Sequence, residues 1–257
     1  MPLTLKIIEN TVLKRKPIES SELPEELKQT VTANSEYVCS SWLQERGHIK
    51  FSLAKDFNFK GFNTWYGFEK HVQVLEDGKV IFPKPKPTSI RLNIPYKSQL
   101  DNEENPTGSC NVTSLAMCLQ FLEAKRKTGV GQFEDELYRY AEDNGLSRHD
   151  PHDLAVIVER YGCRDDFRNN ATIAQVKEWL TDGKPIVIHG YFTTFGHIVT
   201  VTGFDESGLI VHDPYGEWTP YGYRTDLSGQ AVHYSYDMIK NLCIPDGSFW
   251  VHFISKK

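Results

Sequence analysis

Residues 108–117 read Gly-Ser-Cys-Asn-Val-Thr-Ser-Leu-Ala-Met and begin an apolar pattern with the period of a helix. From there apolar residues recur three and four positions apart, at Val112, Leu115, Ala116, Leu119 and Leu122. This spacing predicts a helix that starts near Cys110. The dipole and the free N–H groups at a helix start favour a thiolate, so Cys110 is a candidate nucleophile. The alternative interpretation is a small buried residue at a helix start.

The rest of the C-terminal region changes from helix to strand along the chain. Helical patterns come first, at 132–143, at 153–161 and after the capping-box sequence that begins at Thr172. Strand patterns follow at 185–191, 197–204, 209–212 and 248–254, with a hairpin turn at 205–208. Helices followed by an antiparallel sheet predict the α+β class.

Two polar residues of the predicted hairpin meet at one of its ends. His197 begins one strand and Asp213 closes the next, so both lie at the same end of the strand pair. A histidine base that is oriented by a carboxylate is the partner that a nucleophilic cysteine requires. The alternative is a histidine packed at a strand edge and an Asp-Pro pair that only begins a turn.

The N-terminal region has a different texture, with short β-rich runs separated by polar turns. About 80 residues of this kind predict a small β-barrel over residues 1–80. Residues 82–88 read Phe-Pro-Lys-Pro-Lys-Pro-Thr, which favours an extended spacer over helix or paired strand. We therefore expect a linker over 81–90 and a second domain over 91–257.

Four motifs in the second domain carry a family resemblance. They are Ile94-Pro-Tyr-Lys-Ser-Gln-Leu-Asp101, Ser109–Met117, Gly196-His-Ile-Val-Thr-Val-Thr-Gly203 and Val211-His-Asp-Pro214. Together, and in this order, they resemble the double-glycine leader peptidase-like family of papain-like cysteine peptidases over about residues 92–254. The resemblance implies a papain-like α+β fold. It also implies Cys110 as nucleophile, His197 as base, Asp213 as its orienting partner and Gln99 as oxyanion donor.

The chain departs from that family beside the proposed nucleophile. Many members have Cys-Gly-Pro where this chain has Cys-Asn-Val at 110–112, and the segment 101–109 is longer than usual. We expect the substrate groove to differ here and to include Asn111 and Gly196. Oxygen-bearing side chains at 101–104 could hold calcium, but a solvated acidic loop is the favoured interpretation. We expect no metal and no cofactor.

The N-terminal segment is similar, more loosely, to bacterial SH3-type modules appended to cell-wall enzymes. Its aromatic residues include Trp65 and Tyr66, whose rings are able to stack on sugar or hold a peptide. The resemblance implies a wall-binding role for this domain, with Trp65 and Tyr66 as substrate contacts. The alternative is that such aromatic residues form the barrel core.

Composition excludes several classes of protein. The 257 residues include 39% hydrophobic and 25% charged residues, which is typical of a globular protein. The formal net charge of −5 divides into +2 over residues 1–90 and −7 over 91–257, which argues against a nucleic-acid partner. The five cysteines show no Cys-x-x-Cys spacing and indicate reduced thiols. The sequence has no signal-peptide pattern and no membrane-length apolar run, so we expect a chain that is cytoplasmic as synthesised and enters no membrane. We also expect a monomer.

The leading functional prediction is a cysteine peptidase that hydrolyses amide bonds in peptides of bacterial peptidoglycan. A bacteriophage endolysin or a cell-wall hydrolase would act on the wall after release from the cytoplasm. Two alternatives stay open at this point. One is a catalytically inert peptide-binding module on a papain-like fold. The other is a cytosolic or toxin-type peptidase or acyltransferase.

Overall fold

The computed structural model describes residues 2–257, which divide between residues 86 and 87 into two compact units. Each unit has a hydrophobic core of its own. The predicted linker at 81–90 takes in the end of one strand and the start of another, with residues 83–89 between them outside any strand. None of the helices within residues 2–257 is long and apolar enough to cross a membrane.

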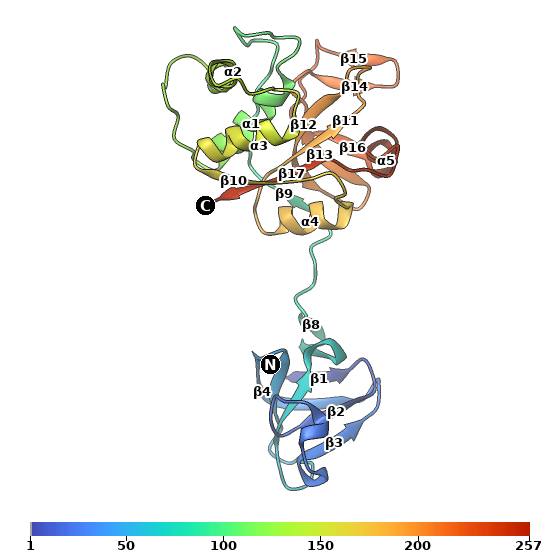
Figure 1. The fold of residues 1–257 in the computed structure, drawn as a ribbon. Coiled ribbons are helices and arrows are strands. Elements are labelled where there is room, and N and C mark those ends of the chain that lie inside the picture. Colours follow the sequence, from blue (N-terminus) through green and yellow to red (C-terminus); the bar gives the residue numbers. More distant parts are fainter. Residues whose placement is uncertain (1) are drawn as a thin grey trace. The chain divides into compact units, whose positions relative to one another are not determined.

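The N-terminal unit is one antiparallel sheet of eight strands in the order β3-β2-β6-β5-β4-β1-β7-β8 (Figure 1). Their bounds are β1 (Leu3–Ile7), β2 (Thr11–Lys14), β3 (Lys28–Val31), β4 (Glu36–Glu45), β5 (His48–Leu53), β6 (Thr64–Phe68), β7 (Val72–Glu76) and β8 (Lys79–Phe82). Short 3-10 turns lie at Ser20–Glu22, Glu25–Leu27 and Glu69–His71.

The sheet of this unit curls around a single core. Val31 near one end of the strand order and Val74 near the other belong to the same hydrophobic cluster. Trp65 lies in this cluster with no exposed surface, and its indole N–H donates to the carbonyl of Phe62. The strand pattern recognised in the sequence therefore forms one small β unit.

The C-terminal unit combines five helices with a seven-stranded antiparallel sheet and a two-stranded ribbon. The helices are α1 (Cys110–Phe121), α2 (Phe133–Asp143), α3 (Pro151–Arg160), α4 (Ile173–Thr181) and α5 (Tyr236–Cys243). The strands are β9 (Ile90–Arg91), β10 (Cys163–Arg168), β11 (Ile186–Gly190), β12 (His197–Phe204), β13 (Gly208–His212), β14 (Glu217–Thr219), β15 (Gly222–Arg224), β16 (Val232–Ser235) and β17 (Val251–Lys256). The prediction of the α+β class is confirmed.

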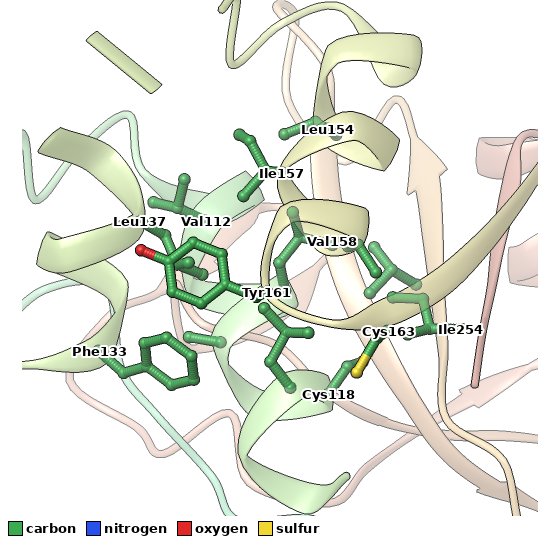
Figure 2. Close-up of a cluster of buried hydrophobic side chains, with 14 of the residues drawn as sticks. Val112, Cys118, Phe133, Leu137, Leu154, Ile157, Val158, Tyr161, Cys163 and Ile254 are labelled. Atoms are coloured by element: carbon green, nitrogen blue, oxygen red, sulfur yellow. The ribbon is translucent and has the colours of Figure 1, made fainter. Parts of the chain in front are cut away.

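Helices cover both faces of the larger sheet, whose order is β10-β17-β11-β12-β13-β16 with β9 on β12. Side chains alternate between the faces, so neighbouring residues of β11 enter different cores. Val187 packs with α1, α2 and α3, whereas Ile186 packs with α4 and α5. Figure 2 shows the first of these cores, in which Val112 and Cys118 of α1 meet side chains of α2, α3, β10 and β17. This packing fixes α1 against the sheet.

Candidate active site

Cys110 is the first residue of α1, and two hydrogen bonds fasten that helix to β12. Ser114 Oγ donates to the carbonyl of Ile198 over 3.1 Å, and Thr200 Oγ1 donates to the carbonyl of Ser114 over 3.1 Å. Both links are buried. The helix start that carries the thiol is therefore held directly beside His197, the first residue of β12.

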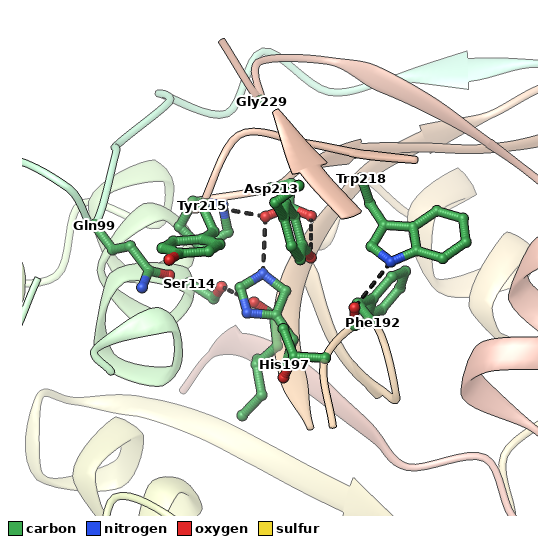
Figure 3. Close-up of polar contacts among 12 residues, drawn as sticks. Gln99, Ser114, Phe192, His197, Asp213, Tyr215, Trp218 and Gly229 are labelled. Atoms are coloured by element: carbon green, nitrogen blue, oxygen red, sulfur yellow. Dashed lines mark hydrogen bonds and ion pairs between the residues drawn. The ribbon is translucent and has the colours of Figure 1, made fainter. Parts of the chain in front are cut away.

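His197 and Asp213 form a buried pair at the end of the β12–β13 hairpin. His197 Nε2 lies 2.8 Å from Asp213 Oδ1 (Figure 3). The carboxylate also accepts hydrogen bonds from the Tyr215 N–H and from the hydroxyls of Tyr223 and Tyr234, at 3.0, 2.9 and 2.7 Å. Because Asp213 holds Nε2, the other ring nitrogen of His197 is the one available to the thiol.

The electrostatics of the pair favour a thiolate. Burial raises the pKa of the Cys110 thiol, but the positive charge of His197 and a hydrogen bond with it lower the pKa below its ordinary value. Burial lowers the pKa of His197, but the Asp213 carboxylate and the Cys110 thiolate raise it to about 10. The two groups therefore stabilise each other as a thiolate and an imidazolium.

The remaining thiols have the opposite character. Burial raises the pKa of Cys39 to about 11 and also raises the pKa values of Cys118, Cys163 and Cys243. All five cysteines are free. A low thiol pKa thus distinguishes Cys110 from every other cysteine of the chain.

Gln99 lies next to this pair and is almost fully buried. Its backbone N–H donates to the carbonyl of Pro214 over 2.9 Å, and its side-chain Nε2 donates to the carbonyl of Pro106 over 3.0 Å. One bond ties Gln99 to the residue after Asp213 and the other ties it to the loop before Cys110. The amide retains a second N–H that no protein group within residues 2–257 accepts.

These residues open into one cavity of about 510 Å³. Its wall includes four of the predicted site residues besides the thiol, namely Gln99, Asn111, Gly196 and His197. Gly196 adopts φ +83°, a left-handed conformation that lets the chain turn directly into His197. The Asn111 amide donates to the carbonyl of Arg148 over 2.6 Å, so it also braces the cavity wall.

Residues 91–244 match the model of the Peptidase_C39 like family, which is more than half of the chain. The chain belongs to this family. It is therefore a cysteine peptidase by family, with the mixed helix and antiparallel sheet fold of that group. No curated protein matches it.

Two solved structures are similar to this C39-like peptidase. One is a C39-like peptidase from Bacillus anthracis, with 16% identity, a TM-score of 0.48 and coverage of 66% of this chain and 100% of the other. The other is a double glycine motif protease from an AMS/PCAT transporter, in complex with the leader peptide. It has 18% identity, a TM-score of 0.40 and coverage of 65% of this chain and 94% of the other.

Two predicted substrate contacts of this C39-like chain lie in the N-terminal unit. The prediction for Trp65 is corrected, because the ring is wholly buried in the core and offers no surface to a ligand. Tyr66 is partly exposed on β6, with the Lys50 ammonium 5.6 Å from its ring centre. In a sheet that buries one face, neighbouring residues point to opposite sides, which is why only one of the two rings is available.

The acidic loop of this C39-like chain is tied to protein groups. The carboxylates of Glu103 and Glu104 pair with Arg139 at 2.8 and 3.0 Å, and their backbone N–H groups donate to Asp135. The Asn102 side chain is buried and donates to Ser109 and Thr113. Across residues 2–257, no cluster of three or more His, Cys, Asp or Glu side chains is arranged to hold a metal ion.

Four partners of Asp213 could not be predicted from the sequence, and the first is Tyr215, whose backbone N–H donates to the carboxylate. Tyr223 and Tyr234 each donate to Asp213, and the carbonyl of Gly229 accepts the Asp213 N–H over 2.9 Å. A Cβ on Gly229 would lie 1.9 Å from the Asp213 carbonyl oxygen, so only glycine fits. Tyrosine and glycine are common in strands and loops, and no local pattern points from them to a carboxylate elsewhere in the sequence.

Proposed function

We propose that this C39-like peptidase uses Cys110 as nucleophile, His197 as acid and base, and Asp213 as the group that orients His197. The observation that carries the proposal is the mutual stabilisation of the thiolate and the imidazolium at the wall of one cavity. A thiolate is the reactive form of cysteine, and a histidine held by a carboxylate is its usual partner.

The proposed reaction has two stages. The Cys110 thiolate attacks the carbonyl carbon of a peptide bond, and the negative charge on oxygen is stabilised by the Cys110 backbone N–H and the free N–H of Gln99. The His197 imidazolium then protonates the leaving amine as the tetrahedral intermediate collapses to a thioester. Water, deprotonated by His197, hydrolyses the thioester and restores the thiolate.

We further propose that the substrate is a peptide of bacterial peptidoglycan and that the N-terminal unit binds the wall as an SH3-type module. Two exposed aromatic rings support this role, since Phe57 is 45% exposed and Phe62 is 37% exposed. In this proposal Tyr66 is a further contact with the wall, and residues 81–90 are the spacer between the two units. Aromatic faces of this kind stack well on sugar rings.

Incubation with purified peptidoglycan, followed by mass analysis of the released fragments, tests the proposed function. The wild-type chain should release peptide fragments with new amino termini, and Cys110→Ala should release none while it keeps its melting temperature. Asp213→Asn should release the same fragments more slowly, because orientation is lost while the nucleophile remains. Equal release by Cys110→Ala and the wild type would reject the mechanism.

A further inference from the structure

A row of three hydrogen-bonded titratable side chains crosses the sheet beside the active site. Asp165 on β10, His252 on β17 and His189 on β11 lie on three neighbouring strands. His252 Nδ1 is 2.8 Å from Asp165 Oδ2, and His252 Nε2 is 2.9 Å from His189 Nε2. The strand register places all three side chains on the sheet face that α1 covers.

Two members of this row, Asp165 and His252, are shielded from water. The side chains of Asp165 and His252 have no exposed surface, and within residues 2–257 His252 is the only basic partner of Asp165. Asp165 Oδ1 is buried without a hydrogen-bond partner in the described chain. An isolated buried charge is very costly, so we infer that Asp165 and His252 share one extra proton and are neutral as a pair.

Neutrality of this pair fixes the tautomer of His189. With the extra proton, His252 donates from Nε2, whether its Nδ1 donates to an Asp165 carboxylate or accepts from a protonated Asp165. His189 Nε2 must then accept, so the proton of the neutral His189 ring sits on Nδ1. Burial and the positive charge of His252 lower the pKa of His189 to about 3, which agrees with a neutral ring.

His189 meets the active-site cavity, unlike the two groups behind it. It lines the cavity together with Cys110 and His197, and it pairs across the sheet with Ile198, the neighbour of His197. No protein group within residues 2–257 binds its Nδ1. The rings of Trp250 and Phe167 pack against the imidazole at 5.8 and 6.2 Å and limit its rotation.

We propose that His189 is a specificity-determining residue that donates a hydrogen bond from Nδ1 to a carbonyl oxygen of the peptide bound in the cavity. Asp165 and His252 act through it as positioning residues that hold the donor tautomer. The assignment rests on the proposed function, because it needs a peptide beside Cys110. A fixed neutral donor selects an oxygen acceptor and discriminates against a substrate that presents an N–H at that point.

Nitrogen-15 NMR of the full-length protein tests the tautomer without any substrate. We expect the His189 signals of a protonated Nδ1 and an unprotonated Nε2 at neutral pH. A His189 ring that is protonated on Nε2 would present an acceptor to the cavity and would overturn the proposal.

Cleavage of a quenched-fluorescent decapeptide library tests the contact itself. His189→Phe should lower kcat/KM about fivefold to tenfold, the loss expected for one hydrogen bond. His189→Asn keeps an N–H near the position of Nδ1 and should recover most of that loss. His152→Phe is the matched control, because His152 packs on Phe167 outside the cavity and its replacement should not lower kcat/KM.

The alkylation rate of Cys110 with iodoacetamide separates this assignment from the proposed function. If Cys110 reacts rapidly and His189→Phe cleaves the library as fast as the wild type, the assignment of His189 is wrong and the peptidase mechanism stands. If the wild-type chain neither reacts rapidly nor cleaves, the proposed function fails and the assignment fails with it.

Discussion

Asp213 shows how a single residue can organise a site. Its carboxylate accepts four hydrogen bonds, from a ring nitrogen, a backbone N–H and two hydroxyls. A buried carboxylate with so many donors is held in one position, and it therefore fixes the orientation of the histidine ring bound to it. The loss of Asp213 would therefore change both the charge and the orientation of His197.

Selective reactivity of Cys110 is the first prediction at this scale. The pKa of its thiol lies below the ordinary value of 9.0, whereas burial raises the pKa values of the other four thiols. As pH rises from 5, iodoacetamide should label Cys110 first, with a midpoint below 9. In His197→Gln the midpoint should move upward, because burial then acts without the imidazolium. Peptide mass spectrometry measures each midpoint, and uniform labelling of all five thiols would contradict the prediction.

Gln99 carries the second prediction. Its spare N–H is expected to meet the oxyanion, so Gln99→Ala should lower kcat about 10²–10³-fold. Gln99→Glu should lower kcat at least as much, because a carboxylate repels the developing negative charge. Steady-state kinetics on a cleaved wall peptide measures both effects. Full activity of the glutamate variant near neutral pH would reassign Gln99 to a structural role.

Single residues also show which parts of the site could be predicted from the sequence. Cys110, His197 and Gln99 lie in short motifs with a recognisable chemistry, and the structure brings these three residues to one cavity. Trp65 was misjudged, because the sequence does not say which face of a strand is buried. The pairing of Asp213 with His197 was predicted, but its tyrosine and glycine partners were missed, since contacts between distant segments depend on strand order that no local pattern encodes.

At the scale of elements, the loop before α1 joins the two halves of the site. The Asn102 side chain donates to Ser109 Oγ at 2.7 Å and to Thr113 Oγ1 at 3.0 Å, and its backbone N–H donates to the Gln99 carbonyl. Asn102 thus links the predicted oxyanion donor to the first turn of the helix that begins at Cys110. The linking residue lies within the segment 101–109 that precedes the proposed nucleophile.

Asn102→Ala should weaken both stability and catalysis. Two buried hydroxyls lose their donor, which should cost about 1–2 kcal/mol in the free energy of unfolding. Turnover should also fall, because Gln99 and the start of α1 lose their common anchor. Asn144→Ala is the control, since the Asn144 amide donates to the Tyr140 carbonyl at the surface and its loss should cost less than about 0.5 kcal/mol. Urea unfolding distinguishes the two variants, and equal stability would show that the bridge is dispensable.

The elements themselves were predicted unevenly, for physical reasons. The apolar period at 112–122 and the capping box at Thr172 both correspond to helices, α1 and α4. Strand β10 was missed because its sequence, Cys-Arg-Asp-Asp-Phe-Arg, is mostly charged, and strand pairing overrides its weak local preference. Strand β16 and helix α5 were missed as well, and both are short.

At the scale of the whole molecule, the chain combines two units that each bury a core of their own. The peptidase family match covers residues 91–244, within the second unit. The larger unit contains every residue of the proposed catalytic set, so we expect the chemistry to proceed without the smaller one. The proposed role of the N-terminal unit is therefore to bring the enzyme to an insoluble polymer, which is a matter of local concentration.

Deletion of residues 1–86 separates these roles. The remaining unit retains both of its hydrophobic clusters, so it should fold and cleave a short soluble peptide at the rate of the full chain. Cleavage of intact walls should slow at least tenfold, because a tethered binder raises the local concentration of its enzyme only on a polymer. Full-length Phe57→Ala/Phe62→Ala should slow wall cleavage in the same direction, with peptide cleavage unchanged. Turbidity loss of wall suspensions and a fluorogenic peptide measure the two activities. If the truncated chain clears walls as fast as the full chain, the N-terminal unit does not bind the wall, and a soluble peptide becomes the better substrate for the same catalytic residues.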